Sequence, residues 1–272
     1  MKECKKVILI IGASSGIGKA CALHLSKLGH TVFGTSRKVK EIEEIPLDGE
    51  KIMFLQMDVT DPKSIHQGIA RVLDIKGKID VLIHNAGIGI AGPIEQTSEE
   101  EAKWQFDVNF FGAFRVTKAI LPYMREWKEG LIIFISSLAG EFGLPYQAFY
   151  SASKSALNNF AEALQMECPF IKVVVIEPGD YNTPFTDNRV IVKGFNPDIP
   201  PYENFKIVIK IQEELERQGG DPMEIAKLVS KIVQNPSYFY YRIGKNANLI
   251  SILGKLMPRR FVIREVARHY GL

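Results

Sequence analysis

The stretch Val7-Ile8-Leu9-Ile10-Ile11-Gly12-Ala13-Ser14-Ser15-Gly16-Ile17-Gly18 joins an apolar run to a glycine-rich turn. The apolar run is continuous and rich in β-branched residues, which predicts a parallel strand buried on both faces. Gly12 lets the chain leave the strand in a conformation closed to other residues, while Gly16 and Gly18 allow close backbone approach. We expect a helix to follow at once, because its free N–H groups favour a pyrophosphate. The turn would hold that group through Gly12, Ser14, Ser15, Gly16, Ile17 and Gly18.

The composition of the whole chain allows one sizeable buried core. The chain has 272 residues, of which 46% are hydrophobic. Because α/β chains of this length commonly fold as one unit, we expect a single domain over residues 1–272. The formal net charge is only +3, from 34 basic and 31 acidic side chains. A mixed surface of this kind carries no broad basic field, which argues against a nucleic-acid partner.

The three cysteines, Cys4, Cys21 and Cys168, are isolated in the sequence. Their spacing indicates neither a metal site nor a disulfide framework, so we interpret them as inert thiols in a reducing compartment. Residues 1–6 are charged and lead directly into the first strand, and no apolar run reaches the ~20 residues of a membrane span. We therefore expect a cytoplasmic protein without a metal.

Strands and helices alternate along the rest of the chain, which predicts a doubly wound parallel sheet of about seven strands. Asp61-Pro62 and Asp221-Pro222 each begin a helix by the N-cap rule, and Ser98 caps one long helix that extends past Val116. The further strands are expected over residues 31–35, 51–59, 79–83, 131–136, 171–176 and 238–242.

Ser36-Arg37 follows the second strand, where the chain passes the adenosine ribose of a bound dinucleotide. An NAD site needs a carboxylate here, whereas a 2′-phosphate needs cations and hydroxyls. The missing acid and the presence of Arg37 favour NADP(H). The alternative is an ordinary basic surface turn.

Tyr150 and Lys154 are four residues apart, which places both on one face of a helix. A cation about 4 Å from the phenol contributes on the order of 4 kcal/mol at an effective dielectric of about 20. Lys154 is therefore expected to lower the pKa of Tyr150, against the opposing effect of burial. Such a pair alone is common on helix surfaces. Here Ser137 precedes it, just past the carboxyl end of a strand, where open α/β sheets bind their ligands.

Taken together, these motifs resemble the classical short-chain dehydrogenase/reductase family, and most closely its members acting on steroids and retinoids. The turn Gly12-x3-Gly16-x-Gly18 matches the family's spacing, although Ile11 replaces its usual threonine. Asn85-Ala86-Gly87 matches a second family element, in which His84 replaces an asparagine. We interpret His84 as a satisfied core or edge histidine rather than a catalyst.

The resemblance implies a full catalytic set of Asn109, Ser137, Tyr150 and Lys154. By that resemblance Tyr150 is the general acid/base and Ser137 orients the substrate oxygen, with Ser136 as the alternative serine. Lys154 would also hold the nicotinamide ribose, and Asn109 would hold a helix bend and a proton-relay water.

The resemblance also extends the cofactor site beyond the glycine turn. Asp58-Val59 corresponds to the adenine-contacting position, although Asp58 could instead cap the next helix. The remaining implied cofactor contacts are Asn85, Ala86, Gly87, Tyr150, Lys154, Pro178, Gly179 and Thr183. Residues 182–220 correspond to the family's substrate lid.

Mostly apolar residues are candidates for the substrate pocket, and none is an obvious partner for a charged substrate: Leu138, Phe142, Leu144, Tyr146, Tyr181 and Phe185, beside Ser137. They favour a hydrophobic ketone, aldehyde or alcohol of steroid, retinoid or long acyl type. The tail over residues 245–272 combines an apolar helix with a basic amphipathic one, which could cover the cleft, pair subunits in a homodimer or homotetramer, or lie on a membrane. A cofactor-binding sensor without catalysis is the alternative to an NADP(H)-dependent oxidoreductase.

Overall fold

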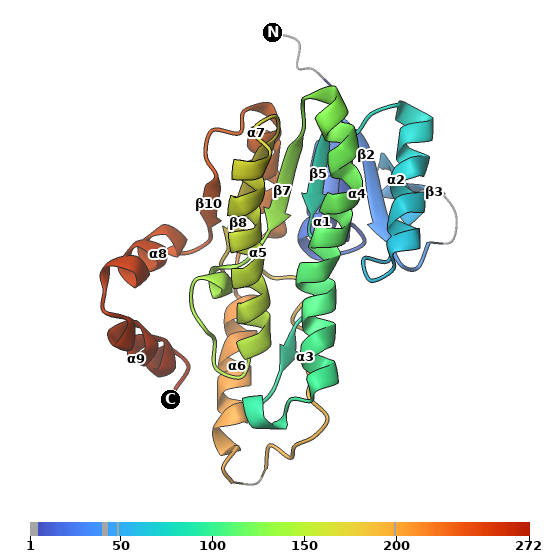
Figure 1. Cartoon of the computed structure of the whole chain (residues 1–272). Helices are drawn as coiled ribbons and strands as arrows, with labels where there is room; N and C mark the ends of the chain where they lie inside the picture. The colour runs from blue at the N-terminus through green and yellow to red at the C-terminus, as the bar shows by residue number, and fades with distance from the viewer. Residues whose placement is uncertain (1–4, 40–42, 48, 199) are drawn as a thin grey trace.

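A computed structural model describes residues 5–39, 43–47, 49–198 and 200–272 (Figure 1). Its centre is a sheet in the order β10-β8-β7-β5-β1-β2-β4-β3, a Rossmann-type arrangement within one domain. Strands β2 and β5 lie on either side of β1, and the chain passes from one side of β1 to the other between β4 and β5. At such a point the carboxyl ends of the strands leave a crevice for a ligand. The strands are β1 (Val7–Ile11), β2 (Thr31–Ser36), β3 (Glu43–Leu47), β4 (Glu50–Gln56), β5 (Val81–His84), β7 (Leu131–Ile135), β8 (Lys172–Pro178) and β10 (Tyr240–Ile243).

In this central sheet seven described strands are parallel, as the sequence predicts. Strand β3 is an additional antiparallel strand at its edge. Leu47 of β3 stands opposite Glu50 of β4, so the two form a hairpin. The sequence of β3 gave no strand signal because it is short, acidic and interrupted by Pro46. These are the features that keep an edge strand from pairing with other chains.

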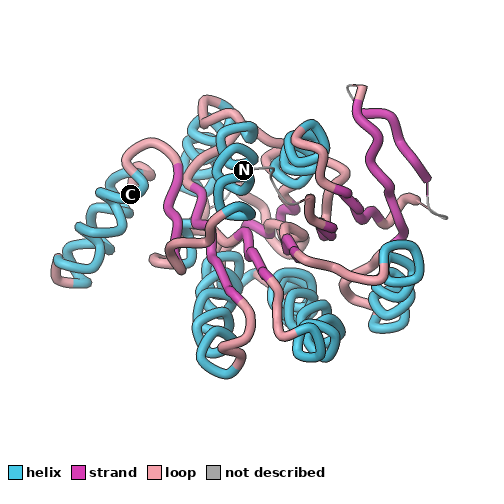
Figure 2. The backbone as a smooth tube through the Cα atoms, turned by 90° about the horizontal axis from the view of Figure 1, so that it is seen from above, coloured by secondary structure: helices cyan, strands magenta, loops and turns pink. Residues whose placement is uncertain are grey.

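Two apolar cores fill the space on either side of the sheet, with helices outside both (Figure 2). On one face lie α2 (Pro62–Lys76), α4 (Gly112–Trp127) and α5 (Ala148–Glu167). On the other face α1 (Gly16–Lys27) packs against α7 (Pro222–Gln234). Ile8 and Ile10 of β1 face one core while Leu9 faces the other, all fully buried. This two-sided burial explains the continuous apolar run at the start of the chain.

The long helix expected after Ser98 is divided into two in the structure. It comprises α3 (Glu99–Phe106), a π-helical turn over Asp107–Phe111 and α4. Ser98 and Glu101 form the N-terminal capping box, with the Ser98 hydroxyl accepting a bond of 3.2 Å from the Glu101 N–H. The π turn places Asn109 at the bend that the family resemblance implies.

Residues 182–220 and the tail lie beyond the carboxyl edge of the sheet (Figure 1). Residues 182–220 leave and return at one point, where Asn182 N donates to Gly220 O at 3.0 Å. Within them β9 (Val190–Ile191) pairs with β6 (Ile90–Ala91), and α6 (Glu203–Arg217) follows. Two 3₁₀ turns, Ile94–Gln96 and Leu138–Gly140, lie in the loops after β6 and β7.

The tail follows β10 as α8 (Ala247–Leu256) and α9 (Arg259–His269), seen beside the body of the domain in Figure 1. No helix in the described part of the chain is both long and apolar enough to cross a bilayer.

Candidate active site

The glycine turn packs closely against the loop that follows β5. Gly12 has φ of 79°, and the Asn85 side chain donates from Nδ2 to the Gly12 carbonyl at 2.8 Å. A Cβ on Gly18 would lie 2.1 Å from that same carbonyl oxygen, so only glycine fits there. Helix α1 begins at Gly16 with no side-chain cap from Ser15. The free N–H groups and the lack of side chains therefore leave a cradle that fits a pyrophosphate.

The end of β2 presents Ser36 and the exposed Arg37 next to the loop after β4. Arg37 lies near enough to Asp58 to help lower the pKa of that carboxyl, together with hydrogen bonds from Thr60, although burial opposes the shift. Asp61, not Asp58, caps α2 by accepting a bond of 2.9 Å from the Lys63 N–H. The capping alternative for Asp58 is therefore wrong.

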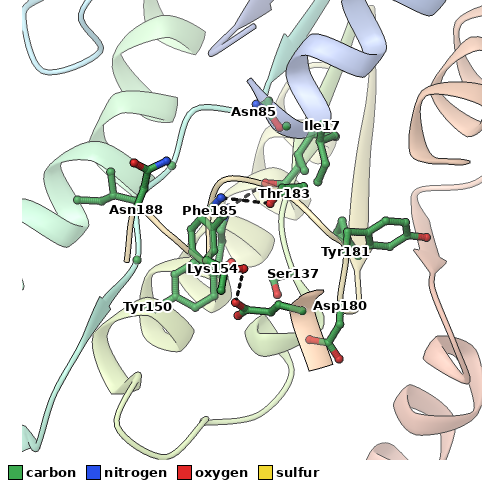
Figure 3. A pocket seen from close by; sticks show the side chains of 18 of the residues that line it. Ile17, Asn85, Ser137, Tyr150, Lys154, Asp180, Tyr181, Thr183, Phe185 and Asn188 are labelled. Carbon is green, nitrogen blue, oxygen red and sulfur yellow. Dashed lines mark hydrogen bonds between the residues drawn. The ribbon is translucent and has the colours of Figure 1, made fainter. Parts of the chain in front are cut away.

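Tyr150 and Lys154 lie on α5 and face the same cleft as Ser137 (Figure 3). Burial raises the pKa of Tyr150 to about 12, against the opposing effect of its hydrogen bond with Ser137. Burial lowers the pKa of Lys154 to about 8. The Lys154 Nζ donates to the Ile135 carbonyl at 2.9 Å and lies 5.9 Å from the Tyr150 ring centre. The expected lowering of the Tyr150 pKa by Lys154 is therefore wrong for this arrangement, in which burial dominates.

The two candidate serines after β7 have different partners. Ser136 is buried and donates from Oγ to Asn158 Oδ1 at 2.6 Å, whereas Ser137 Oγ accepts a bond of 3.1 Å from Ala139 N and lines the same cleft as Tyr150. Because the Ser136 hydroxyl proton is committed to Asn158, the geometry favours Ser137 as the serine that meets a substrate.

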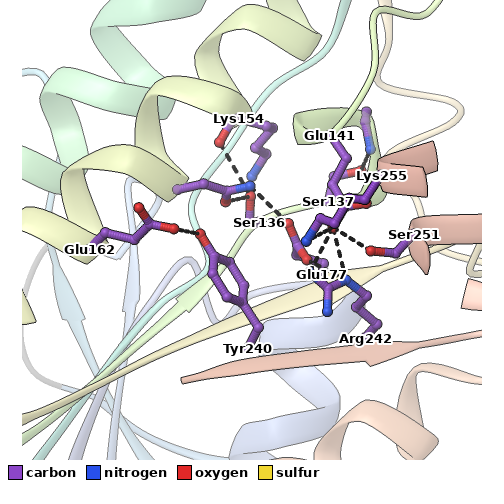
Figure 4. A network of polar contacts seen from close by, with 12 residues as sticks. Ser136, Ser137, Glu141, Lys154, Glu162, Glu177, Tyr240, Arg242, Ser251 and Lys255 are labelled. Atoms are coloured by element: carbon purple, nitrogen blue, oxygen red, sulfur yellow. Dashed lines mark hydrogen bonds and ion pairs between the residues drawn. The ribbon is translucent and has the colours of Figure 1, made fainter. Parts of the chain in front are cut away.

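Behind Ser136 a polar network connects α5 to the tail (Figure 4). Asn158 Nδ2 donates to Glu177 Oε1 at 2.8 Å, and Arg242 pairs with both Glu177, at 3.1 Å, and Glu141, at 2.8 Å. Ser251 of α8 completes the network by donating to Glu141 at 2.7 Å. Burial and the neighbouring Glu141 raise the pKa of Glu177 to about 7. The network connects α8 to α5.

Asn109 lies behind the cleft and uses its whole side-chain amide on protein groups. Its Oδ1 accepts from Ile88 N at 2.8 Å, while Nδ2 donates to Ile88 O and to Ser153 Oγ at 3.0 and 3.1 Å. One turn earlier, Gln105 makes the same kind of paired bonds to Ile88 O and Ile90 N, at 2.6 and 2.8 Å. Asn109 of the π turn and Gln105 of α3 thus anchor the loop that leads into β6.

A polar cleft of about 240 Å³ brings most of the expected site together. Phe185 packs against Tyr150, with ring centres 5.4 Å apart. The expected residues that line the cleft are Ser15, Gly16, Ile17, Asn85, Gly87, Ser137, Leu144, Tyr150, Lys154, Pro178, Gly179, Tyr181, Thr183 and Phe185. Gly12, Ser14, Gly18, Ser36, Arg37, Asp58, Val59 and Ala86 surround the glycine turn or the ends of β2 and β4, outside this lining.

A second cavity of about 370 Å³ adjoins the cleft and is lined mainly by apolar side chains. Leu138 and Phe142 form its inner wall, as expected of substrate-pocket residues. Helices α8 and α9 form the outer wall, with Ile250, Leu253, Met257, Phe261, Val262 and Val266. Of the three arrangements open for the tail, the structure thus shows that its inner face covers a cavity beside the site.

The chain was compared with known proteins. The family model for the short chain dehydrogenase matches residues 6–191, which contain the turn, Ser137, Tyr150 and Lys154. The chain belongs to the short-chain dehydrogenase/reductase family. A 3-ketodihydrosphingosine reductase of Bacteroides thetaiotaomicron is 46% identical to it over 239 residues, 86% of each chain.

Two solved structures extend the likeness of this short-chain dehydrogenase/reductase. A short-chain dehydrogenase from Streptomyces avermitilis has a TM-score of 0.78 and 31% identity, over 97% of this chain and 99% of that one. An alcohol dehydrogenase from Thermococcus sibiricus, complexed with 5-hydroxy-NADP, has a TM-score of 0.72 and 26% identity, over 89% and 97%. These likenesses confirm the fold and the family that the sequence predicts.

Two aromatic residues expected in the substrate pocket of this short-chain dehydrogenase/reductase differ in where they lie. Tyr146 lines neither of the two cavities described above and packs against Phe205 of α6, with ring centres 5.2 Å apart. Tyr181 lines the cleft, but its ring points away into the core (Figure 3), and its hydroxyl donates to Glu224 at 3.2 Å. Tyr146 therefore lines neither cavity, whereas Tyr181 lines the cleft as expected although its hydroxyl has a partner outside it.

The structure also places polar residues at the cleft that the sequence did not reveal. Gln147, Asp180 and Glu216 line it, so the cleft has acidic groups that the mostly apolar candidates from the sequence did not include. Glu216 comes from α6, and its proximity depends on how the lid folds back. Asp180 follows Gly179 at the end of β8, and this position past a strand end was a usable signal.

His84 and the cysteines of this short-chain dehydrogenase/reductase take no direct part in the cleft. His84 is buried, and burial together with the nearby Lys154 lowers its pKa to about 3, so the ring is neutral. Its Nε2 has no partner among the described residues, which corrects the expectation of a satisfied histidine. Cys21 and Cys168 are buried free thiols, and burial raises the pKa of Cys21 to about 12. Cys4 lies outside the described residues.

Proposed function

We propose that the chain is an NADP(H)-dependent oxidoreductase that interconverts a hydrophobic ketone or aldehyde with its alcohol. The observation that carries the proposal is the meeting of Ser137, Tyr150 and Lys154 in one cleft with the glycine turn. A cofactor cradle and a proton donor are needed side by side only when hydride and proton reach the same carbonyl.

In the direction of reduction, we assign the proton to Tyr150 Oη and the orientation of the carbonyl oxygen to Ser137 Oγ. A bound nicotinamide supplies the hydride to the carbonyl carbon. Because the pKa of Tyr150 is raised to about 12, the phenol keeps its proton at neutral pH until the substrate oxygen gains negative charge. We propose that the Lys154 ammonium, which is charged at pH values below about 8, holds the nicotinamide ribose beside Tyr150.

Asn109 is proposed as a positioning residue. Its amide is committed to Ile88 and Ser153, so it acts by holding the π turn and the wall of the cleft. Of the roles that the resemblance implies for Asn109, the helix bend agrees with this geometry, and the proton-relay water stays a prediction.

The preference for NADP(H) rests on Ser36 and Arg37 at the end of β2. Arg37 is exposed, and a guanidinium here can pair with a 2′-phosphate in a bidentate manner. The nearby Asp58 lies past the next strand and has its carboxylate engaged by Thr60 at 2.7 Å. The NADP derivative in the Thermococcus sibiricus alcohol dehydrogenase supports the proposal.

The substrate is proposed to be a ketone with a long apolar chain. The carbonyl would lie at Ser137, and the chain would occupy the apolar cavity closed by α8 and α9. The name of the Bacteroides thetaiotaomicron relative supports this choice, and 3-ketodihydrosphingosine is therefore the first ketone to assay.

Residues 182–220 are proposed as the lid of this site and residues 245–272 as its chain-binding extension. On the outer side of α8, the exposed Leu249, Ile252 and Leu256 form an apolar face beside the basic side chains of Arg259 and Arg260. We propose that this face contacts an anionic membrane surface from which the substrate enters. We also propose a homo-oligomer that covers the exposed aromatic residues Trp104, Phe111 and Phe114 of α3, the π turn and α4.

The proposed function is tested with Tyr150→Phe, compared with Tyr146→Phe outside the two cavities. Loss of the proton donor is expected to lower kcat for ketone reduction by at least about 10²-fold, with the Kd for NADPH changed less than about twofold. Tyr146→Phe is expected to keep wild-type activity. Reduction by Tyr150→Phe at a near wild-type rate would refute the assignment, and NADPH binding without reduction of any carbonyl by the wild type would indicate a sensor.

A further inference from the structure

Asp180 stands where the polar cleft meets the apolar cavity. Five residues line both spaces, namely Ser137, Leu144, Pro178, Gly179 and Asp180. Asp180 is the only one of the five with an ionisable side chain. A ligand that extends from the carbonyl position at Ser137 into the apolar cavity must therefore pass its carboxylate.

The Asp180 carboxylate has no hydrogen-bond or ion-pair partner among the described residues. Its backbone is fixed, because Gly220 N donates to Asp180 O at 3.0 Å. In the described part of the chain, no hydrogen bond or ion pair reaches its side chain, which is exposed to the two spaces. Partial desolvation by the surrounding protein raises the pKa of this carboxyl, while the nearby His269 and Arg189 lower it. A cation placed at this carboxylate would thus gain an interaction without displacing another.

The neighbouring charges leave Asp180 unbalanced. Glu216, the other acid at the cleft, is paired with Arg189 and accepts a bond of 2.7 Å from Thr186. Arg189 is buried and lines neither space, so it meets no ligand there. Its charge is offset by Glu216, and His269 of α9 is the other titratable cation that faces Asp180. Because Arg189 is paired with Glu216, it does not neutralise the Asp180 carboxylate.

We infer that Asp180 binds a protonated amine next to the reacting carbonyl, which makes the enzyme selective for long-chain α-amino ketones. The inference rests on the proposed function. The carbonyl oxygen lies at Ser137 and Tyr150, the ammonium group lies at Asp180, and the alkyl chain fills the cavity beneath α8 and α9. Asp180 is a specificity-determining residue, because it contacts the substrate amine and takes no part in proton transfer.

The test compares two ketones of equal chain length, 3-ketodihydrosphingosine and its analogue without the amino group. Asp180→Asn is expected to lower kcat/KM for the amino ketone by about 10- to 150-fold, chiefly through KM, because a charged hydrogen bond is lost. For the analogue without the amine, kcat/KM is expected to change less than about twofold. Glu214→Gln removes a carboxylate from the exposed side of α6 and is the matched charge control.

Two outcomes would overturn the inference: Asp180→Asn retains the preference for the amino ketone, or it lowers kcat/KM for both ketones equally. Thermal unfolding of each variant separates a folding defect from a binding defect. Binding of dihydrosphingosine is measured by calorimetry in the presence of NADPH, because the alcohol and the reduced cofactor cannot react with each other. Tight binding by the wild type that is weakened at least about tenfold in Asp180→Asn supports the amine site even if neither ketone is reduced. The lack of ketone reduction would then refute the proposed function but not the amine site. Equal affinity in both proteins would refute the amine site.

Discussion

Substitution of Gly18 by alanine tests the glycine turn with a single methyl group. The new Cβ would lie 2.1 Å from the Gly12 carbonyl oxygen and 2.6 Å from Asn85 Nδ2. Side-chain carbons do not approach other atoms closer than 3.0 Å, so helix and turn must separate by about 0.9 Å, the difference between 3.0 and 2.1 Å. That movement also breaks the bond of 2.8 Å between Asn85 and Gly12.

The magnitude follows from three contributions. Overpacking costs about 1–3 kcal/mol, and the lost hydrogen bond costs about 0.5–1.5 kcal/mol. The helix propensity of alanine over glycine returns about 0.5–1 kcal/mol. The free energy of unfolding therefore falls by about 2 kcal/mol, which lowers Tm by roughly 4–8 °C for a chain of this size. We expect the Kd for NADPH to rise at least about tenfold, because the free N–H groups of α1 move away from the phosphates.

Differential scanning calorimetry and fluorescence titration with NADPH measure the two effects. Gly143→Ala is the matched control, because a Cβ on Gly143 meets no atom within 4 Å. If Gly18→Ala has the same Tm and the same Kd for NADPH as Gly143→Ala, the close packing of turn and helix does not shape the cofactor site.

Three further predictions concern the cofactor, the buried network and the tail. Arg37→Ala is expected to raise KM for NADPH at least about tenfold and to leave KM for NADH unchanged. Equal effects on both cofactors in steady-state kinetics would contradict the proposed 2′-phosphate contact. The Glu177 carboxyl has a pKa of about 7 in the folded protein against 4.5 as its ordinary value. Between these pH values the native state binds more protons than the unfolded state, so the free energy of unfolding falls as pH rises, by at most about 1.4 kcal/mol per pH unit. Glu177→Gln should flatten this slope in urea unfolding followed from pH 4.5 to 7, and an unchanged slope would place the titrating group elsewhere. Leu249→Gln combined with Leu256→Gln should reduce co-sedimentation with vesicles containing anionic lipid several-fold, and undiminished sedimentation would exclude this face of α8 as the membrane contact.

The sequence predicted the parallel sheet and the meeting of the glycine turn with Tyr150 and Lys154, because both follow from local patterns. A continuous apolar run fixes a buried strand, and a strand end fixes which edge a serine such as Ser137 occupies. The edge strand β3 was not predicted, because its acidic residues and Pro46 are typical of strands that avoid pairing with other chains.

What the sequence missed depends on contacts between distant segments. Glu216 reaches the cleft only because the lid folds back, and Tyr146 turns from the cleft because Phe205 of α6 packs against it. The pKa of Tyr150 was misjudged for a related reason. Helical spacing places Lys154 nearby, but burial and the Ile135 carbonyl that engages the ammonium come from the tertiary structure.

The tail leaves the domain through a narrow connection. Gly244, with φ of 122°, joins β10 to α8, and a Cβ there would lie 3.3 Å from Gly179 N. Residues of α8 and α9, which follow this glycine, form one wall of the apolar cavity. None of the groups proposed to transfer the proton comes from this part of the chain. In the proposed function, the residues that transfer the proton therefore precede Gly244, whereas the outer wall of the cavity proposed for the alkyl chain follows it. Replacing the tail after Gly244 by that of a relative is therefore expected to change the preferred chain length of the substrate and to leave the reaction unchanged.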